Sequence, residues 1–189
     1  HGIDLCDIKT DDTVAVIGCG MIGLIMLQLA KRAGAAKIIA IEPNDEKRRI
    51  AAELGAELCI NPMAEDVDDA LKKSGITRIT KVIECVGRTE TMEQAIHIAG
   101  KKSVVMFFGL TAPEDTIKVK PFEIFKKEIE IKASYINPYT QKRAVDMIDG
   151  KRIDVSSMIY ETAGLDKLPQ ILADKELRRK GKFIILPND

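Results

Sequence analysis

This chain of 189 residues lacks features that several common protein classes require. Its 29 Lys and Arg residues balance its 29 Asp and Glu residues, so the formal net charge at pH 7 is +0. No basic excess is therefore present to attract nucleic acid or an anionic membrane. The four cysteines, Cys6, Cys19, Cys59 and Cys85, include no Cys-x-x-Cys pair, which indicates neither a zinc knuckle nor a disulfide framework. Reduced thiols are typical of a cytoplasmic protein, and we expect that location.

Only one stretch is long enough and free enough of charge to suggest a membrane helix. It covers residues 13–30, which could cross a bilayer. Three glycines interrupt it, and its pattern changes from β-branched residues to helical spacing. We therefore interpret it as a strand over residues 13–17, a turn, and a buried helix over residues 24–32.

The turn carries the most informative motif of the chain, Gly18-Cys19-Gly20-Met21-Ile22-Gly23. In a Gly-x-Gly-x-x-Gly turn, the first glycine permits the sharp bend, the second lets the backbone approach a pyrophosphate, and the third lets the helix pack closely on the strand. The N-terminus of the helix then offers free N–H groups to the anion. A phosphate-binding P-loop is excluded because Leu24, not Lys, follows Gly23.

The same motif predicts an acidic residue about 20 residues further on, at the end of the next strand. Residues 37–42 form an apolar run that ends in Glu42. A carboxylate at this point can accept hydrogen bonds from both hydroxyls of an adenosine ribose. The sequence therefore predicts a dinucleotide site.

Strand and helix patterns alternate along the rest of the chain. We predict strands at residues 57–60, 81–87, 103–110 and 128–135, and helices at residues 44–55, 65–74, 90–99, 121–127 and 138–149. This alternation predicts an α/β fold with a doubly wound parallel sheet of six strands. Beyond about residue 156 the pattern changes to a short strand at Ile159-Tyr160, a helix near residues 166–174 and a terminal strand. We therefore expect a dinucleotide-binding domain over residues 1–155 and a separate C-terminal segment over residues 156–189.

The catalytic half of a nicotinamide enzyme is missing from the sequence. The cofactor carries the hydride, but the protein must supply an acid or a Lewis acid for the substrate oxygen. Tyr135, Tyr139 and Tyr160 are not followed by Lys four residues later, as a short-chain dehydrogenase would require. His97 lies beside the apolar positions of a predicted helix, and no Cys/His/Glu cluster could hold zinc. We expect the chain, which begins at His1, to be a piece of a longer protein that binds cofactor without catalysing a reaction.

Several stretches resemble the zinc-dependent medium-chain alcohol and polyol dehydrogenases, namely residues 14–23, 51–56, 60–62 and 83–87. Residues 126–138 are similar to the sorbitol, butanediol or threonine dehydrogenase branches. The resemblance implies a Rossmann domain with NAD as the cofactor, an alcohol or polyol as the substrate, and zinc ligands upstream. The C-terminal segment would return to the missing catalytic domain, so strand 182–186 would lack its sheet partners here. The family pairs subunits through the last strand of the Rossmann sheet, which implies a homo-oligomer formed through residues 128–135.

The resemblance also implies a role for individual residues. The turn is formed by Gly18, Gly20 and Gly23; the pyrophosphate meets Met21, Ile22 and Lys182; the ribose meets Glu42 and Lys47; the adenosine meets Cys85 and Val86; and the nicotinamide carboxamide meets Phe108, Gly109 and Leu110. Arg88 follows the loop glycine and has no defined role. Surface positions are the alternative for Lys47 and Lys182, and a core position is the alternative for Phe108. Because the Glu42 carboxylate would repel a 2′-phosphate, we predict NAD over NADP, although Lys47, Arg48 and Arg49 act against this preference.

Two other functions compete with this interpretation. A nucleotide-sensing regulatory module would suit the glycine loop and Glu42 equally well, but it leaves the C-terminal segment without an explanation. A methyltransferase usually carries an acid two residues before the first glycine of its loop. Val16 occupies that position here, which argues against a methyltransferase.

Overall fold

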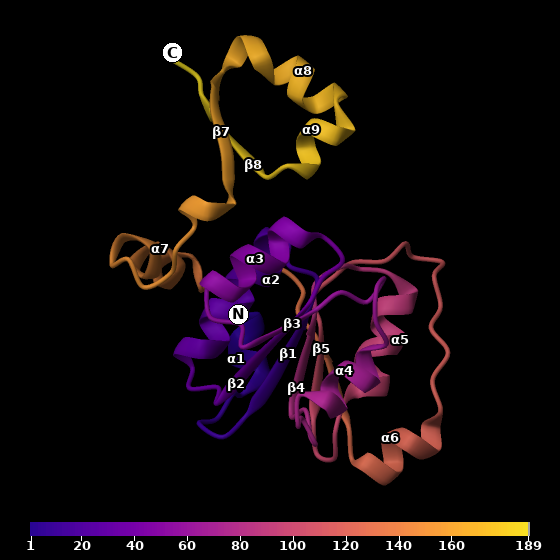
Figure 1. Ribbon diagram of the computed structural model, residues 1–189. Coiled ribbons are helices and arrows are strands. Elements are labelled where there is room, and N and C mark those ends of the chain that lie inside the picture. Colours follow the sequence, from indigo (N-terminus) through magenta and orange to yellow (C-terminus); the bar gives the residue numbers. More distant parts are fainter. Residues whose placement is uncertain (189) are drawn as a thin grey trace.

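A six-stranded parallel sheet forms the centre of the computed structural model, which describes residues 1–188 (Figure 1). Its strands are β1 (Thr13–Ile17), β2 (Lys37–Ile41), β3 (Leu58–Ile60), β4 (Lys81–Glu84), β5 (Val104–Phe107) and β6 (Glu130–Ala133). Their order across the sheet is β3-β2-β1-β4-β5-β6. The chain winds outward from β1 in one direction and from β4 in the other, so the predicted doubly wound sheet is confirmed.

Helices cover both faces of this sheet, because side chains of successive strand residues point to opposite faces. Val14 and Val16 of β1 pack in one hydrophobic cluster, with α1 (Gly2–Cys6), α2 (Met21–Arg32) and α3 (Asp45–Glu53). Ala15 and Ile17 pack in the other, with α4 (Val67–Lys73) and α5 (Thr89–Ile98). Burial on both faces explains why these strands read as nearly continuous apolar runs.

The predicted elements are present, with shifted ends. Helix α3 starts after Asn44, whose side chain accepts a hydrogen bond from Lys47 N at 3.0 Å, and α6 (Pro121–Lys127) has the predicted bounds. The last three strands of the sheet are shorter than predicted, because residues beyond Glu84, Phe107 and Ala133 turn into loops. The helix predicted over residues 138–149 begins later, as α7 (Gln141–Asp149).

The C-terminal segment forms a second, two-stranded parallel sheet that Figure 1 shows apart from the first. It consists of 3-10 turns at Ser156–Met158 and Leu165–Lys167, strand β7 (Ile159–Gly164), helices α8 (Leu168–Ala173) and α9 (Lys175–Arg179), and strand β8 (Lys182–Leu186). The expectation that the terminal strand lacks a sheet partner was wrong, because β8 pairs with β7 along its length. Helices α8 and α9 provide the crossover that a parallel pair requires.

A buried glutamine joins α2 to the start of this segment. The Gln28 side chain is 8% exposed. Its Nε2 donates to Asp154 O at 2.8 Å, and Asp154 N donates to Gln28 Oε1 at 2.8 Å. This pair of hydrogen bonds fixes the backbone of residue 154 to the middle of α2.

The uncharged stretch at residues 13–30 forms a strand, a turn and the start of a helix, as predicted. Across residues 1–188, no helix combines the length and the apolar character needed to cross a membrane. All four cysteines are free thiols.

Candidate dinucleotide site

The glycine-rich turn lies between β1 and α2, and its three glycines meet different surroundings. Gly18 has a left-handed φ of +88°, and a Cβ added there would lie 2.5 Å from Val86 Cγ2. A Cβ at Gly23 would lie 1.8 Å from Gly18 O. A Cβ at Gly20 would have no neighbouring atom of the described chain within 4 Å. The first and third glycines are thus required by the fold, whereas the second borders open space.

That open space faces the N-terminus of α2. Gly20 is the N-cap residue, and no side chain of the described residues caps the helix. The first turn contains no acidic residue, Met21 is half-buried, and Ile22 is 37% exposed. Free N–H groups and the positive end of a helix of 12 residues are suited to a phosphate anion. These residues therefore fit the pyrophosphate of a dinucleotide.

Glu42 follows β2 and holds two loops together. It is 6% exposed, and its Oε2 accepts the N–H of Cys19 at 2.7 Å, while its Oε1 accepts the N–H of Asn44 at 3.0 Å. The carboxylate therefore bonds both the glycine-rich turn and the start of α3. Because a carboxylate has about four acceptor positions, two remain for ribose hydroxyls.

Basic side chains from α3 lie near the same turn. Lys47 is half-buried. Burial, followed by the negative charge of Glu42, raises the pKa of the Cys19 thiol to about 12, whereas Lys47 and Arg48 oppose that rise. Arg48 was not among the predicted site residues. Its Nη1 donates to Glu42 O at 2.7 Å, and its Nη2 is paired with the Asp45 carboxylate. Its position six residues after the acid was the only sequence signal for this contact.

Glu84 is a second residue that the sequence prediction missed. Its side chain is fully buried at the end of β4. Its Oε1 accepts from Val86 N at 2.8 Å, from Gly87 N at 2.9 Å and from Thr91 Oγ1 at 2.8 Å. Its backbone oxygen accepts from Phe108 N and Gly109 N at 2.9 and 3.0 Å. Glu84 therefore supports both loops predicted to line the site, and its position directly after two buried apolar residues was a usable signal.

The loops after β4 and β5 lie in direct contact. A Cβ at Gly109 would lie 2.1 Å from Gly87 N, so the two backbones pack closely. Val86 and Leu110 are 43% and 90% exposed, whereas Cys85 is half-buried and its pKa is raised, mainly by burial. Phe108 packs against one of the two core clusters, which favours its alternative interpretation as a core residue.

Two candidates differ from the rest. Arg88 is the N-cap residue of α5, and its exposed side chain lies 3.4 Å from Glu90. Lys182 begins β8 in the separate two-stranded sheet.

His97 is also outside the site, because its Nε2 lies 2.6 Å from Asp68 Oδ2 between α5 and α4. Within residues 1–188, no group of three or more His, Cys, Asp or Glu side chains could hold a metal ion.

The strand order and the glycine-rich turn at the point where that order reverses define a Rossmann-type dinucleotide-binding fold. The profile of the zinc-binding dehydrogenases matches residues 22–166. The chain therefore belongs to the zinc-binding dehydrogenase family, and it is similar to the cofactor-binding part of those proteins.

Individual relatives agree with this assignment. An S-(hydroxymethyl)glutathione dehydrogenase from Escherichia coli is 29% identical over 94% of this chain and 49% of its own length. An L-threonine 3-dehydrogenase from Caldanaerobacter subterraneus is 37% identical over 60% of this chain and 33% of its own. A crystal structure described as a zinc-binding dehydrogenase from Sinorhizobium meliloti, bound to NADP, is 33% identical, with a TM-score of 0.94 over 99% of this chain and 56% of its own. The chain spans about half the length of the S-(hydroxymethyl)glutathione dehydrogenases that it matches.

Proposed function

We propose that this chain is the cofactor-binding part of a medium-chain dehydrogenase that oxidises an alcohol or polyol with NAD. The observation that carries the proposal is the N-terminus of α2, which opens to free space at Gly20 while Glu42 anchors the adjoining turn. This arrangement offers N–H groups to a pyrophosphate and a carboxylate to the neighbouring ribose.

The remaining candidates would surround the other parts of the cofactor. Met21 and Ile22 would donate backbone N–H groups to the pyrophosphate. Val86 and Cys85 would lie beside the adenosine, and the backbone of residues 108–110 would meet the nicotinamide carboxamide. The bound nicotinamide would accept the hydride, so this chain's own residues position the cofactor and supply no reacting group.

We infer a preference for NAD from Glu42, whose negative charge would repel a 2′-phosphate and whose free acceptor positions suit a 2′-hydroxyl. The relative from Sinorhizobium meliloti is bound to NADP, and that protein shows that a similar chain accommodates the phosphate. The choice between the two cofactors therefore depends on local charges, which a binding measurement can resolve.

The residues described here do not fit a zinc site. We propose that the zinc ligands and most of the substrate pocket belong to residues outside these 189. Residues 1–155 would then form the cofactor domain, and residues 156–189 would return to the catalytic domain. The chain by itself should bind the cofactor and oxidise no alcohol.

We further propose a homo-oligomer formed through residues 128–135, and a cytoplasmic location that suits four free thiols. Strand β6 is an edge of the six-stranded sheet, and its Ile131 is 42% exposed. An edge strand with exposed apolar side chains is a template for pairing with another chain.

Calorimetric titration of the purified 189-residue chain with NAD and with ADP-ribose tests the proposed function. Both ligands should bind, because both contain the pyrophosphate and the adenosine ribose. A Gly20→Val variant should keep its unfolding temperature and lose binding, since its side chain would fill the open space. Absence of NAD binding by the unaltered chain, or turnover of an alcohol by it, would contradict the proposal.

A further inference from the structure

We propose that Asp45 is a specificity-determining residue that keeps Arg48 from binding a 2′-phosphate, and so reserves the ribose pocket for a cofactor with a free 2′-hydroxyl. This inference rests on the proposed function and names the residue that sets its cofactor class.

Arg48 lies beside Glu42, the residue proposed to bind the ribose. In dinucleotide folds, the acid at the end of the second strand binds the 2′-hydroxyl, and an arginine nearby can accommodate a 2′-phosphate. Arg48 Nη1 donates to the backbone oxygen of Glu42 at 2.7 Å, so its guanidinium is fixed at the end of β2. The Arg48 side chain is 16% exposed, and it is thus held in place before any ligand binds.

The other side of this guanidinium is occupied by Asp45. Nη2 of Arg48 is paired with Asp45 Oδ1, three residues earlier in the first turn of α3. An arginine binds a phosphate best with two parallel N–H groups. Asp45 uses one of these groups and adds a negative charge that repels a phosphate. Removing that charge should therefore turn Arg48 into a phosphate ligand.

Glu42 favours NAD in the same direction, but its charge is less accessible to a ligand than that of Asp45. Its carboxylate is 6% exposed and already accepts two backbone N–H groups, which disperse its charge and hold it in place. The Asp45 side chain, by contrast, is 90% exposed. The accessible acid beside the ribose pocket is thus Asp45.

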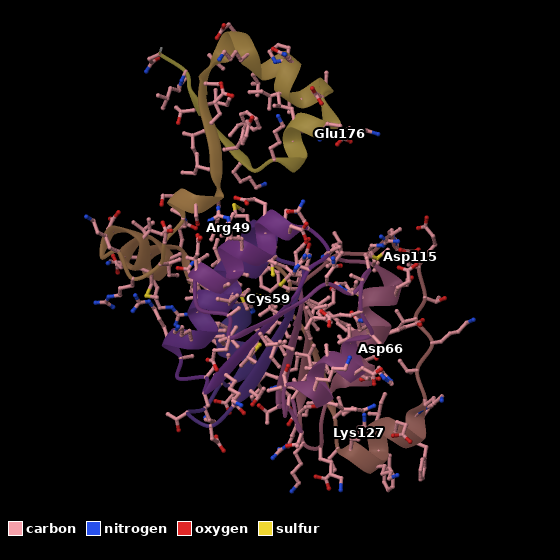
Figure 2. The ribbon with its side chains drawn as sticks, in the orientation of Figure 1. Arg49, Cys59, Asp66, Asp115, Lys127 and Glu176 are labelled. Carbon is pink, nitrogen blue, oxygen red and sulfur yellow. The ribbon has the colours of Figure 1, made fainter. Side chains whose placement is uncertain are left out.

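Three other charged residues at α3 are paired with one another. Arg49, on the same helix (Figure 2), is paired with Glu46 at 2.6 Å and also with Glu53. Glu46 therefore provides a matched control, because it is the adjacent acid of the same helical turn and pairs with a different arginine. Lys47 is half-buried and supplies a second positive charge near the turn.

The test compares 5′-AMP with 2′,5′-ADP, and NAD with NADP, by calorimetric titration of the 189-residue chain. The unaltered chain should prefer the ligands without a 2′-phosphate. Asp45→Asn should shift the affinity ratio by about tenfold toward the phosphorylated ligands, which is the effect of one charge-assisted hydrogen bond. Glu46→Gln should shift the ratio by less than about twofold, because the carboxylate it neutralises is paired with Arg49 and not with Arg48. The double variant Asp45→Asn with Arg48→Gln should lose the gain.

Each outcome bears on a different claim. If the unaltered chain binds none of the four ligands, the proposed function and this inference both fail. If it binds them and Asp45→Asn leaves the ratio unchanged, only the inference fails. An equal shift in Glu46→Gln, or a gain that survives loss of Arg48, would also overturn it, since the effect would then come from the general charge of the helix.

Discussion

Gly23 packs directly on the backbone of Gly18. A Cβ at Gly23 would lie 1.8 Å from the carbonyl oxygen of Gly18 and 2.9 Å from its carbonyl carbon. Backbone atoms cannot move aside as a flexible side chain can. The first turn of α2 is therefore in contact with the end of β1, and this contact sets where the N-terminus of the helix points.

Gly23→Ala should accordingly destabilise the protein and weaken cofactor binding together. The added methyl group forces α2 away from β1, with an expected loss of about 3 kcal/mol in the free energy of unfolding. Urea unfolding and NAD titration measure the two effects. Gly20→Ala is the control for stability, because its methyl group enters open space and should cost less than about 1 kcal/mol. Equal stability of the two variants would contradict this account of the turn.

Glu84→Ala should be among the most destabilising single substitutions of a polar residue in this chain. It removes the buried acceptor of Val86 N and Gly87 N, and unsatisfied buried donors cost about 3 kcal/mol in total. Glu84→Gln keeps one acceptor oxygen and should lose less than half as much. Glu90→Ala, which alters an exposed carboxylate nearby, should change stability by less than about 0.5 kcal/mol. Denaturant midpoints that do not differ among the three variants would refute the role of Glu84.

Cys19 should make the protein less stable in alkali. Burial, followed by the charge of Glu42, raises the pKa of its thiol from 9.0 to about 12. Above pH 9 the unfolded chain releases this proton while the folded chain keeps it, so the free energy of unfolding falls as the pH rises. Between pH 8 and pH 10, the unaltered chain should lose about 1 kcal/mol more than Cys19→Ala. Comparing the two pH values for each chain cancels the packing cost of the substitution, and parallel pH curves would show that the thiol has no part in the effect.

Ile131→Lys should separate the subunits of the proposed oligomer. The side chain is 42% exposed on β6 at the edge of the sheet, and a charge there opposes strand pairing. Sedimentation should show an association of the unaltered chain that the variant loses. Val145→Lys on α7, where the valine is 43% exposed, should associate like the unaltered chain. A monomeric unaltered chain would refute the interface.

The sequence predicted the sheet because its signals are local. Residues 14–17 alternate between the two core clusters, and Gly18 and Asn44 mark a turn and a helix start without reference to the rest of the chain. Strand ends were less predictable, because apolar residues continue past them. Phe108 extends the apolar run of β5, yet the strand ends at Phe107, and the N–H groups of Phe108 and Gly109 both donate to Glu84 O.

The missed features depend on contacts that only the folded chain creates. Strand β8 pairs with β7 across two helices, and nothing within residues 182–186 indicates that partner. Arg48 looked like one of several charges on an exposed helix until folding placed it against the end of β2. Glu84 lies in the family-like stretch at residues 83–87, but its role requires the backbones of two separate loops.

The two hydrogen bonds between the Gln28 side chain and the backbone of residue 154 couple α2 to the C-terminal segment. The N-terminus of this helix faces the expected phosphates, and its middle holds the backbone just before the C-terminal segment. Any tilt of α2 on ligand binding would therefore move the start of that segment as well. No flexible hinge at residue 154 would be needed for this movement.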